Sequence, residues 1–167
     1  EVAANATAPG YTFSGWSTGK AEIEDGKFTM PADAVTITGS FTANNNTKYK
    51  VEYYLQNLAG DGYDLDTTDT LTGVTDTEVD AVVKSYTGFT FNKDAEGSVL
   101  SGTITGDESL VLKVYYDRNS YEVTYDYGKA PAGASALPQG GTHKYGEVVE
   151  VAANATAPGY TFSGWST

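Results

Sequence analysis

The chain has 167 residues, of which 22 are acidic and 10 are basic, so its formal net charge is -12. Such an acidic surface repels the phosphates of nucleic acids and of anionic membranes, which argues against both as partners of this segment. The absence of cysteine excludes disulfides, thiol nucleophiles and thiolate metal sites. No apolar run approaches the roughly 18 residues that a membrane-spanning helix needs.

The first segment, residues 1–18, reads EVAANATAPGYTFSGWST, and residues 150–167 repeat it without a substitution. An identical internal match at a fixed offset, here 149 residues, indicates a tandem repeat. We therefore expect the chain to be a window on a longer repetitive protein.

Both copies of this segment carry alternating aromatic residues beside turn glycines. The aromatic rings could form a platform that stacks on sugars, but their alternation favours core packing, because each ring can bury about 150 to 250 Å². The glycines suit unusual backbone dihedrals or close approach. The predicted structural signature of the two copies is Gly10, Tyr11, Phe13, Gly15, Trp16, Gly159, Tyr160, Phe162, Gly164 and Trp165.

Alternation continues in the next segments and predicts half-buried strands. Residues 35–42, VTITGSFT, alternate apolar positions with Thr and Ser, and the polar run NNNT at 44–47 then marks a boundary. In residues 48–56, KYKVEYYLQ, one face carries Tyr49, Val51, Tyr53 and Leu55. Period-two alternation of this kind predicts a strand with one face on a core.

An acidic cluster follows in the sequence DGYDLDTTD. Its carboxylates, which could bind Ca²⁺, are Asp61, Asp64, Asp66 and Asp69. The spacing lacks the Gly and Glu positions of an EF-hand loop. We interpret the cluster as a solvated hairpin loop and assign no metal site.

Residues 77–91, TEVDAVVKSYTGFTF, contain a short apolar run followed by Gly88, Phe89, Thr90 and Phe91. The same order of Gly, aromatic, Thr and Phe recurs in residues 146–165. Periodicity leaves a short helix and a strand equally open for the apolar run. Gly88, Phe89 and Phe91 join the structural signature.

The run SLVLKVYYD at 109–117 predicts the last strand of this module, with Leu110, Leu112, Val114 and Tyr116 on one face. A boundary is predicted near RNS at 118–120, before the alternating run YEVTYDY at 121–127. The only histidine, His143, lies among turn residues, and we expect it to be exposed to solvent. The chain offers no nucleophile elbow, phosphate loop or zinc motif, so no catalytic residue, cofactor or enzymatic activity is predicted.

The boundaries predict one complete module of 71 residues, 48–118, between two incomplete pieces, 1–47 and 119–167. Joining 119–167 to the following repeat's residues 19–47 gives a second module of 78 residues. Neither piece is expected to bury a proper core by itself, because each lacks strands that the other supplies. The pieces would be joined either within one continuous polypeptide, which we favour, or by exchange between chains.

The segments GYTFSGWST and FTMPADAVTITGSFTA resemble the Listeria-Bacteroides repeat, also called the internalin B-repeat. By this resemblance, 1–47 is the C-terminal part of one such module and 119–167 is the N-terminal part of the next. Residues 48–118, with YKVEYYLQNLAGDGYDL and SLVLKVYYDRN, resemble repeats of the mucin-binding-protein type. The resemblance implies a β-rich α+β class, with small β-grasp-like modules in tandem, mostly antiparallel or mixed sheet and little helix.

The resemblance also implies an extracellular location on the cell surface of a Gram-positive bacterium, in a protein that acts as a stalk or an adhesive arm. Two hypotheses follow. The first is a structural spacer whose partners are neighbouring copies in series, and identical copies favour it. The second is an adhesive module that binds host glycans, mucin or a surface protein. Covalent Lys–Asn cross-links, for which Lys50 and Lys113 are candidates, stay open at this point.

Overall fold

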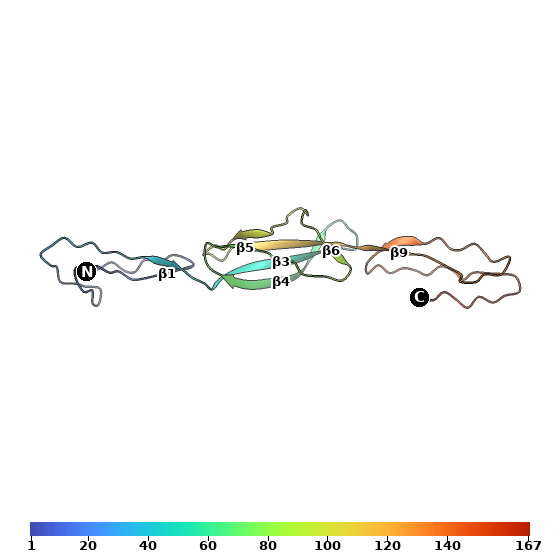
Figure 1. Ribbon diagram of the computed structural model, residues 1–167, viewed down its shortest axis with the longest axis horizontal. Coiled ribbons are helices and arrows are strands. Elements are labelled where there is room, and N and C mark those ends of the chain that lie inside the picture. The colour runs from blue at the N-terminus through green and yellow to red at the C-terminus, as the bar shows by residue number, and fades with distance from the viewer.

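The computed structural model describes residues 1–167 and contains ten strands and no helix. The strands form one four-stranded sheet and three two-stranded sheets. The four-stranded sheet and one of the small sheets lie together in the middle of an elongated molecule, and the other two small sheets and the chain ends lie in the two outer parts (Figure 1). The predicted β-rich class is confirmed, whereas the α+β description is not, because helices are absent.

The four-stranded sheet has the order β4-β3-β8-β6. Its long strands are β3 (Thr47–Gln56), β4 (Tyr63–Gly73) and β8 (Val111–Arg118), and the short edge strand is β6 (Phe89–Phe91). β3 pairs with β4 in the antiparallel sense and with β8 in the parallel sense, and β6 is antiparallel to β8. The two strands predicted at 48–56 and 109–117 are therefore confirmed and lie side by side.

The core comes from one face of these two central strands. Tyr49, Val51 and Tyr53 of β3 are buried, as the alternation predicts, while Lys50 on the opposite face is exposed. Leu112, Val114 and Tyr116 of β8 and Ile104 complete the set of buried hydrophobic residues. Ile104 follows β7 (Ser101–Thr103), which pairs with β5 (Glu78–Asp80). Every buried residue lies between Thr47 and Tyr116, so neither outer part has a core of its own.

The outer parts contain one small sheet each. β1 (Tyr11–Phe13) pairs with β2 (Phe41–Ala43), and β9 (Ser120–Val123) pairs with β10 (Gly141–Lys144). The strand predicted over 35–42 is mostly wrong, because before Phe41 only Thr38 makes a ladder contact, with Ser17. The strand predicted over 121–127 ends at Val123.

The open choice between helix and strand in residues 77–91 is decided by the two short strands β5 and β6. In the apolar run, Val82 and Val83 are exposed by 63% and 48%, whereas Val79 and Ala81 are partly buried against the core. No helix in the structure is long and apolar enough to cross a membrane.

Candidate functional site: the module junctions

One glycine turn occurs three times in the molecule, and two of the copies, at Gly10 and Gly88, stand where the parts of the molecule meet. Gly10, Gly88 and Gly159 have φ values of 78°, 79° and 76°, in the left-handed region that suits glycine. In each copy the following aromatic residue donates its backbone N–H to the carbonyl three residues before it, at 3.1 to 3.2 Å; the pairs are Tyr11 with Ala8, Phe89 with Tyr86, and Tyr160 with Ala157. The shared Gly-aromatic-Thr-Phe sequence therefore encodes one local structure three times.

The first copy makes the N-terminal junction, between the β1–β2 sheet and the central sheet. The Gly10 carbonyl accepts hydrogen bonds from the Asn44 N–H at 2.8 Å and from the Thr75 hydroxyl at 2.7 Å. The Thr75 N–H in turn donates to the Asn44 carbonyl at 2.9 Å. Thr75 is buried, and its hydroxyl lies 2.7 Å from that of the equally buried Thr47. These bonds tie the outer part to the turn after β4.

Side chains and a close backbone contact complete this junction. The Tyr11 hydroxyl donates to the Asp76 carboxylate, and this hydrogen bond raises the pKa of Tyr11. Gly106 lies so close to Pro9 that a Cβ at position 106 would overlap the Pro9 carbonyl. Glycine is required there for space, because the two backbones touch.

The C-terminal junction is organised by Arg118, the only arginine of the chain. Its Nε donates to the carbonyl of Gln56 on β3 at 3.0 Å, and its terminal N–H donates to the carbonyl of Tyr145 at 2.8 Å. The guanidinium also stacks over the Phe89 ring, with its carbon 4.7 Å from the ring centroid. One planar side chain thus joins the central sheet to the segment after β10.

The second glycine turn contributes to this junction. The Tyr145 ring packs edge-on against the Phe89 ring, with the two centroids 5.9 Å apart. A Cβ at Gly88 would overlap the Tyr145 ring. The Gly88 carbonyl accepts from the Asn119 N–H at 2.9 Å. The Lys144 ammonium donates to the carbonyls of Leu58 and Ala59 at 3.0 and 3.1 Å. The hairpin turn after β3 is therefore fastened to the C-terminal part.

Apart from Tyr11 and Phe89, which make contacts across the junctions, the aromatic signature residues pack within their own parts of the chain. The rings of Phe13 and Trp16 pack together with their centroids 5.0 Å apart, and the centroids of their counterparts Phe162 and Trp165 are 4.8 Å apart. Gly15 and Gly164, which separate the members of each pair, both have positive φ. In the central part, Phe91 contacts the buried Tyr116 at 5.9 Å. Sequence reasoning singled out these residues but missed Thr75, Asp76, Arg118 and Tyr145. A lone arginine at a predicted boundary is the signal that could have pointed to Arg118.

The acidic cluster is mostly not a loop, which corrects the interpretation from sequence. Asp64, Asp66 and Asp69 belong to β4, and only Asp61 lies in the turn, where it accepts a hydrogen bond from the Asn57 amide at 2.8 Å. Asp66 is the extra residue of a bulge opposite Tyr53 and Tyr54, and Asp69 forms a 2.7 Å ion pair with Lys84. These carboxylates do not converge, and no group of three or more acidic or histidine side chains could hold a metal ion.

His143 lies on β10 and not in a turn, and its side chain is 29% exposed, so the histidine expected to be exposed to solvent is half-buried. Its Nδ1 lies 3.0 Å from a carboxylate oxygen of Glu147. The hydrogen bond from His143 lowers the pKa of Glu147. The pair closes the turn after β10 and thereby places Tyr145 for the junction.

Two family models match the outer parts. Residues 1–45 match the divergent InlB B-repeat domain, and residues 121–167 match the Listeria-Bacteroides repeat domain. The predicted resemblance is confirmed for these segments, whereas the mucin-binding-protein type of the central part is not matched. Listeria-Bacteroides repeat domains occur in bacterial surface proteins, so the matches are consistent with a surface repeat segment. No curated protein and no solved structure matches the chain.

Proposed function

We propose that this chain is a stalk or spacer segment of a long repetitive bacterial cell-surface protein or extracellular filament. The two junctions carry the proposal, because hydrogen bonds and close contacts at glycines join the central sheet to the part on each side of it. Such contacts set the direction of one part relative to the next. In a spacer, function lies in length and stiffness, and no catalytic role is assigned.

We further propose that residues 48–118 are a complete module of β-grasp type, flanked by the incomplete pieces 1–47 and 119–167. The support for the β-grasp arrangement is that the first and last long strands, β3 and β8, are adjacent and parallel in the centre of the sheet. Confinement of the buried residues to 47–116 supports the division. The adjoining partners are then neighbouring copies of the repeat, arranged in series.

Small-angle X-ray scattering of residues 1–167 tests the spacer proposal. We expect the scattering of a stiff rod, with the cross-section of one module and a length that spans all three parts (Figure 1). A chain whose parts move independently would give the profile of a flexible string and would contradict the proposal.

The alternative, an adhesive module for host glycans, mucin or a surface protein, calls for a binding measurement. We expect no selective binding of the chain to a glycan array or to purified mucin. Strong and selective binding would favour the adhesive function over the spacer.

A further inference from the structure

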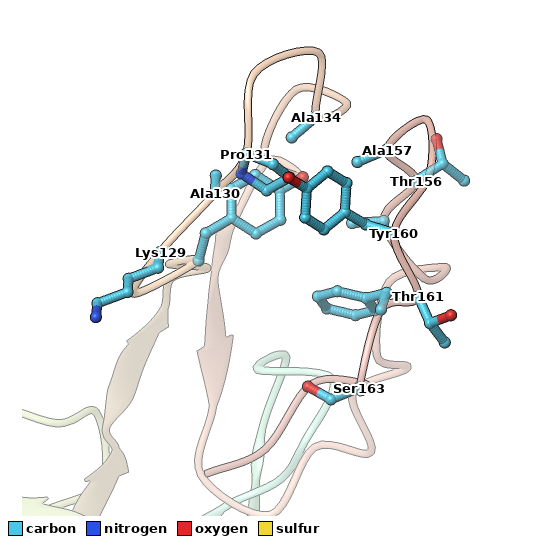
Figure 2. Close-up of a pocket in the computed structure, with 12 residues that line it drawn as sticks. Lys129, Ala130, Pro131, Ala134, Thr156, Ala157, Tyr160, Thr161 and Ser163 are labelled. Atoms are coloured by element: carbon cyan, nitrogen blue, oxygen red, sulfur yellow. The ribbon is translucent and has the colours of Figure 1, made fainter.

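Surface without a partner is found in two places on the molecule. In the C-terminal part, Tyr160 stands across from Pro131 at a pocket of about 230 Å³ (Figure 2). This part is an incomplete piece in the proposed division, so strands of the following repeat are expected to cover that surface. The central part is complete, and a free edge of its sheet lies along one long side of the molecule, between the two junctions (Figure 1). An array that continues at the two ends of the molecule leaves this edge open.

The free edge is β4, whose outward backbone groups have no partner. The Lys50 N–H donates to the Leu110 carbonyl beside β8 at 3.0 Å, so the backbone groups of the β3 residues next to Lys50 face β4. By the register, Thr68, Thr70 and Thr72 of β4 then direct their N–H and C=O groups away from the sheet. All three are exposed, and no loop or neighbouring strand bonds to their backbone groups. The edge therefore presents donors and acceptors to an approaching strand.

The two halves of β4 differ in how they are protected from such pairing. In the first half, the bulge at Asp66 interrupts the ladder and Asp64 adds another exposed carboxylate, both of which hinder pairing at an edge. The second half, residues 67–73, has no bulge, proline or lysine, and its only charged residue is Asp69. The 2.7 Å ion pair with Lys84 offsets this charge. Residues 67–73 are therefore an unprotected edge.

The unprotected half of β4 is complementary to itself in the antiparallel sense. When Thr70 stands opposite Thr70 of a second copy, Thr68 stands opposite Thr72, and each of these pairs can exchange two backbone hydrogen bonds. Threonine pairs across strands are favourable. In the same register Asp69 stands opposite Leu71, so no two carboxylates face each other. Centring the pair on Asp69 would place two like charges opposite each other, which disfavours that register.

We propose that two copies of this chain associate through residues 67–73 of β4, antiparallel and centred on Thr70, so that their four-stranded sheets join into one. Because β4 runs along the long axis of the molecule, the two copies point in opposite directions (Figure 1). Stalks that project from two facing surfaces meet in this way. The inference goes beyond the spacer function, since it gives the stalk a homotypic contact. One such contact is short, but it recurs in every repeat, and linked contacts strengthen one another through multivalency.

Sedimentation of the full chain tests the association. We expect the weight-average mass of the wild type to rise above 17.6 kDa, towards that of a dimer, as concentration increases. Thr70→Pro removes an outward N–H that the pairing with β3 does not use, and edge strands tolerate proline at such positions. This variant should associate at least about tenfold more weakly and keep the urea midpoint of the wild type. Thr70→Val keeps the donor and is the matched control.

Two outcomes of this experiment overturn the proposal, whether or not the chain scatters as a rod. The first is a wild type that stays monomeric up to about 1 mM, which excludes even a weak specific contact. The second is a folded Thr70→Pro variant that associates as the wild type does, because the copies then meet through another surface.

A cysteine cross-link tests the register and does not depend on proline being tolerated. The chain has no cysteine, so a disulfide in a single-cysteine variant must join two copies. In Thr70→Cys the two cysteines form a hydrogen-bonded pair, whose Cα atoms lie about 5.5 Å apart, within reach of a disulfide. In Thr68→Cys they lie four residues out of register, roughly 13 Å apart.

Mild oxidation should therefore yield covalent dimers of Thr70→Cys at least about tenfold faster than of Thr68→Cys. The double variant Thr68→Cys/Thr72→Cys should regain the fast rate, because residue 68 of each copy stands opposite residue 72 of the other. Equal rates for the two single variants would contradict the antiparallel register, since parallel strands bring both positions together equally.

Discussion

Tyr54 and Tyr86 are two tyrosines whose hydroxyl groups stay protonated well into the alkaline range. The hydrogen bond to Glu52 is the main cause that raises the pKa of Tyr54 to about 12, and burial is the main cause for the same value at Tyr86. Below the ordinary pKa of 10.0, both tyrosines are neutral in the folded and the unfolded chain. Between 10 and about 12 only the unfolded chain loses these protons, so the free energy of unfolding falls as pH rises.

Thermal unfolding between pH 9 and pH 12 checks this prediction. We expect the Tm of the wild type to fall by several degrees across the window from about pH 10 to about pH 12. Tyr54→Phe and Tyr86→Phe remove the titrating hydroxyls and should flatten the decline. Tyr121→Phe, at a tyrosine that is 53% exposed, is the matched control and should follow the wild type. Identical slopes for all four proteins would contradict the assignment.

The substitution Gly106→Ala tests the N-terminal junction by adding a single side-chain carbon, the Cβ. Alanine at position 106 would bring its Cβ onto the Pro9 carbonyl, so the outer part must move away. We expect the amide of Thr75, which donates to Asn44 across the junction, to exchange with solvent at least about tenfold faster, as for a bond that opens locally. Gly19→Ala, at a glycine surrounded by open space, should leave this exchange unchanged. Unaltered protection of Thr75 in Gly106→Ala would show that the contact is not structural.

At the scale of elements, the adjacent strands β3 and β8 supply most of the buried core residues of the central part. Leu112 on β8 is fully buried, and its truncation to alanine removes contacts that the close-packed core cannot replace. We expect Leu112→Ala to lower the free energy of unfolding by about 2–5 kcal/mol in urea titrations. Lys50→Ala, on the exposed face of β3, should change it by less than about 0.5 kcal/mol. Similar losses for the two variants would contradict the assignment of the faces.

The sequence predicts β3 and β8 well, because the apolar residues that alternate along each strand are the ones that are buried. It predicts β4 poorly, because the run DLDTTDTLTG has no continuous apolar face and becomes a strand only by pairing with β3. Residues 35–40 carry a clear alternation yet form no strand, because most of them have no partner to pair with. At the junctions, the glycine turns could be predicted from repetition, whereas Thr75 and Asp76 have no local signal, since their role depends on contacts with residues about 65 positions away.

At the scale of the whole molecule, the three parts differ in what stabilises them. The central part has its own core, while the outer parts have half-buried aromatic clusters and depend on the junctions for their placement. Stability in such an arrangement resembles that of repeat proteins, in which each unit contributes its own term and each interface another. A substitution at a junction should therefore change stiffness without unfolding the core.

Substitution of Arg118 allows the stiffness of a junction to be measured separately from the stability of the core. The Arg118 side chain donates to Tyr145 across the junction, while its contacts with Gln56 and Phe89 hold the guanidinium on the central sheet. Arg118→Ala therefore removes the hydrogen bond across the junction together with the two contacts that position it. The hydrogen bonds of a charged group contribute on the order of 1.5–3 kcal/mol, enough to change a held orientation into a mobile one. Because the chain has no cysteine, spin labels can be attached only at introduced sites. Labels at the exposed positions Thr68 and Val148 report the distance across the junction.

We expect a narrow distribution of distances between these labels in the wild type and a markedly broader one in Arg118→Ala, with the urea midpoint of the central module little changed. Lys93→Ala removes an exposed cation that pairs only with its neighbour Asp94, and it should keep the narrow distribution. If Arg118→Ala unfolds the central module, the arginine stabilises the core and not the junction. If the distribution stays narrow in a folded Arg118→Ala chain, stiffness comes from Lys144, Asn119 and the packing of Tyr145 on Gly88, which together still span the same gap.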